Sequence, residues 1–213
     1  MYASKILLFV AAAVSASPIG SMMESDSTNQ LAAREAPKLY KGSWDKFPAK
    51  STWKSFDELW KKNLPAMKTK GDTQQETEDI KSALKSVGKK YSIEDRVLLS
   101  IMMQESHGDV RAKTTYSQPD NLPTGGLFQC WNCPGFTSKP VTKAQITQMV
   151  EGGAKHFKEN LSHWGNTMDP KSVYPALREY NSGKVNPKDL SEAPQSTPSY
   201  VSDIAQRLGG WTG

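Results

Sequence analysis

The chain has 213 residues, of which 37% are hydrophobic and 23% charged, and 27 Lys and Arg against 22 Asp and Glu give it a net charge of +5. This length allows one globular domain with an additional segment, and no apolar run approaches the roughly 20 residues that a membrane-spanning helix needs. With only 2 Cys and 3 His, the composition excludes a disulfide-framework protein and a protein with several zinc sites.

The first 16 residues have the pattern of a secretory signal peptide. Lys5 precedes the apolar run 6–14, and small residues follow at positions 14–16, which is the order that such signals have. A buried N-terminal helix is the alternative, but we expect a secreted, extracellular protein. Residues 17–37 are polar and Ser-rich without sustained periodicity, which indicates a disordered linker or a pro-segment.

Residues 38–70 form a Trp- and Lys-rich N-terminal extension, with nine Lys against three acidic residues. Its large apolar residues recur at helical spacing, which predicts a helix with one apolar and one basic face: Trp53, Phe56, Leu59, Trp60 and Leu64. Either the apolar face packs onto the following domain and the lysines are solvated, or the basic face binds an anionic partner such as a cell wall. Residues 71–213 carry 16 basic and 16 acidic side chains, so the net charge does not predict nucleic-acid binding.

From residue 71 the pattern is that of a mainly α domain. Thr73 and Glu76 form a capping-box signature before an apolar stripe that ends at Gly88. A second helix is expected to begin at Ser92.

Three further helices are expected nearer the C-terminus. One begins after Thr142, one runs from about Pro175 to Gly183, and the last begins near Ser199. Only the Gly-rich stretch 120–136 favours a small β-hairpin or loop region. We therefore expect a single helical domain over residues 71–213.

Glu105 continues the apolar stripe of the second helix, four residues past Ile101 and three past Met102. Burial and the negative end of the helix dipole both disfavour its charged form, so both should raise its pKa. A general acid that works near neutral pH needs such a pKa. The alternative is a structural carboxylate that pairs with one of three arginines: Arg96, Arg111 or Arg178.

Three short motifs surround this glutamate in chain order. They are residues 100–110 (SIMMQESHGDV), residues 125–129 (GGLFQ) and residues 176–183 (ALREYNSG). In this order they resemble the motifs of the lysozyme-like lytic transglycosylase domain, glycoside hydrolase family 23, which includes the goose-type lysozymes. The resemblance covers about residues 72–209, and the chain looks most like the secreted fungal branch of that family. Phe128 stands where the family usually has Met.

The resemblance implies a lysozyme-like fold and a role for each matching residue. Glu105 would be the catalytic acid and base, and Ser106 would bind substrate or orient the glutamate. Gln129 would contact the sugar, Tyr180 would hydrogen-bond near the glutamate, and Asn181 would line the saccharide cleft. The implied substrate is a polymer of N-acetylated amino sugars with β-1,4 bonds, most closely peptidoglycan, and no metal or organic cofactor is implied.

Most glycosidases use two carboxyl groups, an acid and either a nucleophile or a base that activates water. The resemblance implies an exception, in which one Glu protonates the glycosidic oxygen and then takes the proton of the substrate's own C6 hydroxyl, giving a 1,6-anhydro sugar. Asp109 and Asp120 are the candidates for a second carboxylate that would hold a hydrolytic water, and Asp is also common in exposed turns. Hydrolysis and anhydro formation therefore both stay open.

Two other functions are compatible with the same sequence. A chitin-oligosaccharide hydrolase would use the same residues on a different polymer. A secreted saccharide-binding or effector protein would keep the cleft without turnover.

Cys130 and Cys133 have the spacing of a redox motif. Such a motif needs a helix that begins within it, whereas Pro134 follows at once, so a local disulfide is the better interpretation in an oxidising compartment. A zinc site would need two further ligands, and the seven-residue separation of His156 and His163 lies outside the usual spacing.

Overall fold

The computed structural model describes residues 36–117, 121–194 and 196–213. The predicted signal peptide, most of the predicted linker and Asp120 lie outside the described residues. By its contacts the chain divides after Ala33, and every described residue belongs to the second unit, which begins at Arg34.

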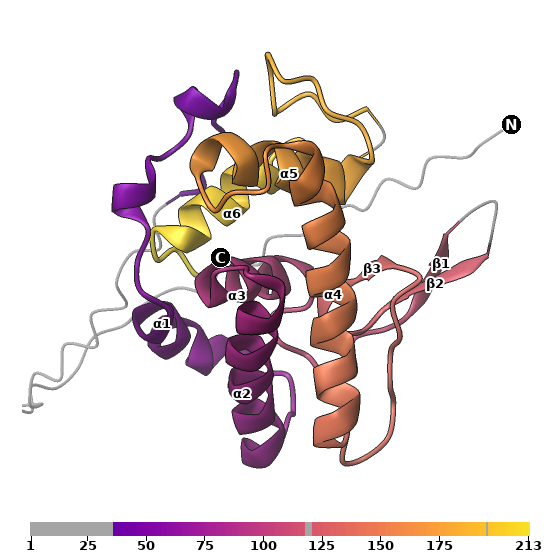
Figure 1. The fold of residues 1–213 in the computed structure, drawn as a ribbon. Coiled ribbons are helices and arrows are strands. Elements are labelled where there is room, and N and C mark those ends of the chain that lie inside the picture. The colour runs from indigo at the N-terminus through magenta and orange to yellow at the C-terminus, as the bar shows by residue number, and fades with distance from the viewer. Residues whose placement is uncertain (1–35, 118–120, 195) are drawn as a thin grey trace, which may run out of the picture. The chain divides into compact units, whose positions relative to one another are not determined.

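The described residues form six α-helices and a small antiparallel sheet (Figure 1). The helices are α1 (Phe56–Lys68), α2 (Gln74–Tyr91), α3 (Asp95–Glu105), α4 (Lys143–His163), α5 (Pro170–Ser182) and α6 (Tyr200–Leu208). The strands are β1 (Thr115–Ser117), β2 (Leu122–Gly125) and β3 (Cys130–Trp131), and single 3-10 turns lie at η1 (Trp44–Lys46), η2 (Lys50–Thr52) and η3 (Gly126–Phe128). The predicted mainly α class is confirmed. None of the described helices is both long and apolar enough to cross a membrane.

Helix α3 is the central element of this unit. It packs against α1, α2, α6 and η3, while α4 packs against α2 and α5. These neighbours enclose α3, so every residue from Val97 to Met103 is buried. The acidic side chain of Asp95 in its first turn suits the positive end of the helix dipole.

The capping box predicted at Thr73 and the helix start predicted after Thr142 are confirmed, and each of these side chains accepts a hydrogen bond from the third helical N–H. The predicted end of α2 is wrong, because the helix continues through Gly88 to Tyr91. A Cβ atom at Gly88 would lie 2.8 Å from the Ile93 carbonyl oxygen, so this glycine allows a close chain crossing rather than ending the helix. Ser92 is consequently the left-handed C-cap of α2 and not the N-cap of α3.

Helix α5 begins earlier than predicted. Pro170 occupies its first turn, where a missing N–H costs nothing, and Pro175 lies inside the helix. The predicted end is confirmed, because Gly183 is the C-cap with a left-handed φ of 64°. Such a φ favours glycine.

The sheet has the strand order β1-β2-β3, with both neighbouring pairs antiparallel. Strands β2 and β3 lie within the predicted hairpin region 120–136, whereas β1 precedes that region and was not predicted. Thr124 lies opposite Thr115 on one side and opposite Trp131 on the other. In Figure 1 the β1–β2 hairpin extends away from the helices beside α4.

The N-terminal extension contributes to the same hydrophobic core as α2–α6. Its apolar face is buried at Trp53, Phe56, Leu59 and Trp60. The Trp53 indole N–H donates to the Tyr174 hydroxyl at 3.1 Å, and that hydroxyl donates to the Pro48 carbonyl at 2.6 Å. The aromatic face therefore packs as the first of the two interpretations predicts.

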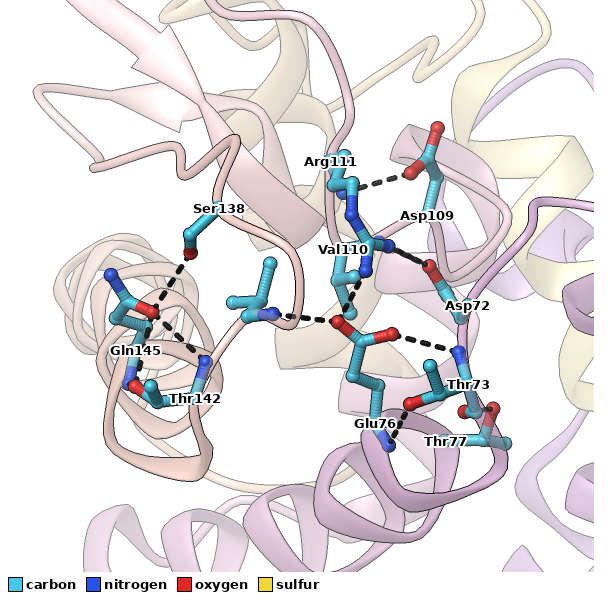
Figure 2. A network of polar contacts seen from close by, with 11 residues as sticks. Asp72, Thr73, Glu76, Thr77, Asp109, Val110, Arg111, Ser138, Thr142 and Gln145 are labelled. Atoms are coloured by element: carbon cyan, nitrogen blue, oxygen red, sulfur yellow. Dashed lines mark hydrogen bonds and ion pairs between the residues drawn. The ribbon is translucent and has the colours of Figure 1, made fainter.

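A buried polar network joins the start of α2 to two distant loops (Figure 2). The Arg111 guanidinium contacts Asp72 Oδ1 at 3.1 Å and also pairs with Glu76. Glu76 further accepts the backbone N–H of Val141 at 2.7 Å and that of Thr73 at 2.7 Å. Burial alone would raise the pKa of Glu76, but these hydrogen bonds outweigh it and lower that pKa to about 2.

Asp72 is the less favourable member of the network. Its side chain is fully buried. Burial raises the pKa of Asp72 to about 6, although the Val110 N–H and the Arg111 charge act in the opposite direction. Arg111 is thus the cation that makes two buried carboxyl groups tolerable.

Replacement of Arg111 by Met should destabilise the protein strongly, because it leaves Glu76 buried without its cation. We expect the free energy of unfolding at pH 7 to fall by about 3–5 kcal/mol in urea denaturation. Lys85→Met is the matched control, since Lys85 pairs with the exposed Asp57 at 3.2 Å and should cost less than about 1 kcal/mol. Losses of equal size in the two variants would contradict a stabilising role for the buried network.

Candidate active site

Glu105 is the last residue of α3 and its side chain is partly exposed. The helix ends there because the next residues turn the chain sharply: Ser106 has a φ of −132°, and His107 and Gly108 have left-handed φ values of 55° and 82°. This turn leaves the carboxyl group at the end of a buried helix instead of within the core.

The direct partner of the carboxyl group is Tyr200, the first residue of α6. Its hydroxyl donates to Glu105 Oε1 at 2.5 Å, and its side chain is only 3% exposed. Burial raises the pKa of Glu105 to about 7, and the hydrogen bond from Tyr200 offsets this rise only in part. Glu105 can therefore carry a proton near neutral pH.

The three arginines that a structural role would require all have other partners. Arg96 pairs with Glu94 at 2.5 Å, and Arg111 belongs to the network of Figure 2. Arg178 is fully buried and donates to carbonyl oxygens of the segment before α6, one of them at 3.1 Å. Glu105 forms no ion pair with any residue that the structure describes.

Tyr180 lies close enough to Glu105 for the charge of the carboxylate to affect the pKa of its hydroxyl. Burial raises the pKa of the Tyr180 hydroxyl well above its ordinary value, and the negative charge of Glu105 raises it further. The hydroxyl donates to the Phe128 carbonyl at 2.8 Å, and the ring meets His156 edge-on with centroids 4.8 Å apart. Tyr180 thus links α5 to η3 beside the glutamate, while Tyr200 makes the direct hydrogen bond.

Ser106 fastens the end of α3 to the same turn. Its buried hydroxyl donates to the Leu127 carbonyl at 2.9 Å and accepts the Gly108 N–H at 3.2 Å. These contacts occupy the hydroxyl within the protein. The hydroxyl therefore holds the end of α3 against η3, and none of its hydrogen bonds is to Glu105.

Gln129 and Asn181 are both partly buried and occupied by local contacts. Gln129 has a left-handed φ of 42°, and its Nε2 donates to the Gly126 carbonyl at 2.8 Å. Asn181 Oδ1 accepts from the Arg178 guanidinium and from the Thr197 N–H at 3.2 Å. Asn181 therefore connects α5 to the segment that precedes α6, and Tyr200 is the first residue of α6.

The second carboxylate is not found beside Glu105 among the described residues. Asp109 Oδ1 accepts the Arg111 N–H at 2.8 Å, which makes it part of a turn at the edge of the buried network (Figure 2). Only burial and Tyr200 account for the shifted pKa of Glu105, without a contribution from a neighbouring carboxylate. Asp120 lies outside the described residues.

The predicted Cys130–Cys133 disulfide is present, and it closes the turn after Gln129. In the part of the chain that the structure describes, no group of three or more His, Cys, Asp or Glu side chains is arranged to hold a metal ion.

Tyr200 is the residue of this site that sequence analysis missed. It shares a helical stripe with Ile204 and Leu208, and that stripe reads as core. A usable signal is that a buried tyrosine hydroxyl needs a hydrogen-bond partner, and Glu105 is a buried group that equally needs one.

Comparison with known proteins provides no assignment: no family model, no curated protein sequence and no solved structure matches the chain. The site must therefore be interpreted from its own geometry and from the motifs.

The raised pKa makes Glu105 a source of instability at neutral pH. Because its pKa is about 7 in the folded state against an ordinary 4.5, the unfolded state loses its proton first as pH rises between these values, and folding becomes less favourable. Allowing for partial exposure, the loss should be about 2–3 kcal/mol. Glu105→Gln should therefore be more stable than wild type at pH 8 and equally stable at pH 4 in urea denaturation. The same difference at both pH values would show that Glu105 does not titrate in this way.

Proposed function

We propose that this chain is a secreted glycosidase of the lysozyme-like lytic transglycosylase type, which cleaves the β-1,4 bonds of peptidoglycan. Support comes from the three ordered motifs and from a mainly α fold with a small sheet, which is compatible with a lysozyme-like domain. Each motif contributes to one connected group of contacts: Glu105 and Ser106 from the first, residues 127 and 128 from the second, and Tyr180 from the third.

One observation carries the proposal: Glu105 is enclosed, hydrogen-bonded by Tyr200 and unpaired with any described cation. A structural carboxylate is normally ionised and paired, because burial of an unpaired charge is costly. A general acid needs the opposite, a carboxyl group that keeps its proton near the working pH and retains access to substrate. A pKa of about 7 and a partly exposed side chain make Glu105 compatible with these conditions.

In the proposed reaction, Glu105 donates its proton to the glycosidic oxygen as the bond between that oxygen and the anomeric carbon breaks. The sugar is left with oxocarbenium character, and the Glu105 carboxylate then acts as the base. Tyr200 stabilises this carboxylate through its hydrogen bond. If the C6 hydroxyl attacks, its proton returns to Glu105 and a 1,6-anhydro end forms; if water attacks, the product is a reducing end.

Glu105→Gln should nearly abolish turnover, because Gln keeps the shape of the side chain but has no acidic proton to donate. We expect a loss of soluble products from purified peptidoglycan of about a hundredfold to ten-thousandfold, measured by mass spectrometry. The wild-type rate should fall as pH rises through about 7, where Glu105 loses its proton. Activity without this basic limb would contradict the acid role, and undiminished activity of the variant would refute it.

The same experiment separates the alternatives. Anhydro ends indicate a transglycosylase and reducing ends indicate hydrolysis. Products from N-acetylglucosamine oligomers but not from peptidoglycan would favour the chitin-oligosaccharide hydrolase. Binding of either polymer without products from the wild-type protein would favour the non-catalytic saccharide-binding or effector protein.

The basic face of the N-terminal extension is proposed to hold the enzyme on an anionic cell wall. Several lysines of this extension are exposed and make no ion pair within the described residues, among them Lys54, Lys61, Lys68 and Lys70. Because the opposite face is part of the core, the contact cannot be tested by deleting the extension without disturbing the fold. Exposed charges can be changed without this cost.

The triple variant Lys61→Gln, Lys68→Gln, Lys70→Gln should adsorb to intact cell walls about tenfold less at low salt, and the difference should shrink as salt screens the charges. The matched control is Lys171→Gln, Lys184→Gln, Lys188→Gln, which removes three exposed lysines from α5 and the segment after it. The measurement is a sedimentation assay at several salt concentrations. Equal adsorption of the two triple variants would show that net charge matters and the position on α1 does not.

A further inference from the structure

The small sheet displays an aromatic side chain that the fold itself does not use. Trp131 is 51% exposed, and no described residue hydrogen-bonds its indole N–H. An indole is a large apolar surface, and a ligand that stacks on it removes that surface from water, which is favourable. The position of Trp131 indicates what that ligand is.

The backbone around Trp131 is held rigidly. Strand β3 pairs Trp131 with Thr124, the Cys130–Cys133 disulfide closes the turn, and the Cys133 N–H donates to the Cys130 carbonyl at 3.1 Å. Asn132 supplies the left-handed residue of this turn, with a φ of 56°. An aromatic group fixed in this way loses little entropy when a ligand stacks on it.

The chain segment that carries Trp131 is polar but uncharged. Residues 121–138 contain no Asp, Glu, Lys, Arg or His. The register places the side chains of Thr115 and Thr124 on the same face of the sheet as the indole. Such a face offers an apolar plane beside hydroxyl groups and provides no charge for a phosphate or a carboxylate.

Trp131 also lies near the candidate active site along the chain. It is three residues past Phe128, so their Cα atoms are at most about 11 Å apart. The Phe128 carbonyl accepts the Tyr180 hydroxyl at 2.8 Å, and the Leu127 carbonyl accepts the Ser106 hydroxyl at 2.9 Å. The strand that carries Trp131 therefore follows directly on the segment that contacts Ser106 and Tyr180.

We propose that Trp131, with Thr124 and Thr115, is a stacking platform for an uncharged sugar unit of the polymer cleaved at Glu105. A pyranose ring has an apolar C–H face that fits an indole plane and a rim of hydroxyls that fits threonine side chains. This inference rests on the proposed function and adds a binding position outside the three motifs. Trp131 binds substrate and takes no part in bond cleavage.

The test compares Trp131→Ala and Trp131→Phe with the matched control Trp44→Ala, which removes an indole that is 38% exposed on η1. Binding is measured in the Glu105→Gln background with an N-acetylglucosamine hexamer by calorimetry and with purified peptidoglycan by sedimentation. We expect Trp131→Ala to weaken binding about fivefold to tenfold, Trp131→Phe to retain most of it, and Trp44→Ala to leave it unchanged. In the active protein, Trp131→Ala should raise KM with little change in kcat.

The outcomes separate this inference from the proposed function. Cleavage with unchanged affinity in Trp131→Ala would overturn the platform and leave the glycosidase standing. Trp131-dependent binding, together with no cleavage by the protein with Glu105 intact, would support the platform and contradict the glycosidase proposal. No binding of either glycan by any variant would overturn both proposals.

Discussion

A carboxyl group enclosed without a cation is the constraint on which the rest of this structure depends. Glu105 cannot be stabilised by charge pairing if it is to keep a proton, so its surroundings must hold it by shape and by a neutral hydrogen bond. The buried stretch of α3 from Val97 to Met103 fixes its backbone, and Tyr200 provides the hydroxyl. The free energy for this unfavourable group must come from the core around it.

The segment 126–129 is where the elements around Glu105 meet. Ser106 reaches its Leu127 carbonyl from α3, and Tyr180 reaches its Phe128 carbonyl from α5. The N-terminal extension contacts this segment only indirectly. Trp53 and the Pro48 carbonyl hydrogen-bond the Tyr174 hydroxyl, which lies in the first half of α5. A segment that looks like an appendage in the sequence therefore supports the helix that carries Tyr180.

Sequence patterns were sufficient wherever a local rule decides the structure. The capping box at Thr73, the helix that begins after Thr142 and the helix stop at Gly183 follow from nearest-neighbour chemistry and from helical periodicity. They were insufficient where a distant contact decides. Gly88 reads as a helix end, and only its contact with the Ile93 carbonyl explains why the helix passes through it.

The candidate site divides in the same way. Glu105 and Tyr180 could be predicted because a motif and a helical stripe agree on them. Tyr200 could not, since its hydroxyl finds Glu105 across 95 positions of sequence, and no spacing rule connects residues that far apart. The orientation of Ser106 toward a carbonyl is likewise a property of two segments and is invisible in either one alone.

Gly153 in α4 limits which side chains can stand beside the candidate site. A Cβ atom at Gly153 would lie 2.1 Å from the Cγ atom of Phe128, so the phenyl ring occupies the space of an absent side chain. Glycine costs about 1 kcal/mol of helix propensity relative to alanine. Helix α4 bears this cost, and the Phe128 ring can then lie against it while the Phe128 carbonyl accepts the Tyr180 hydroxyl. A side chain at position 153 would therefore require a smaller side chain at position 128, so the two positions are sterically coupled.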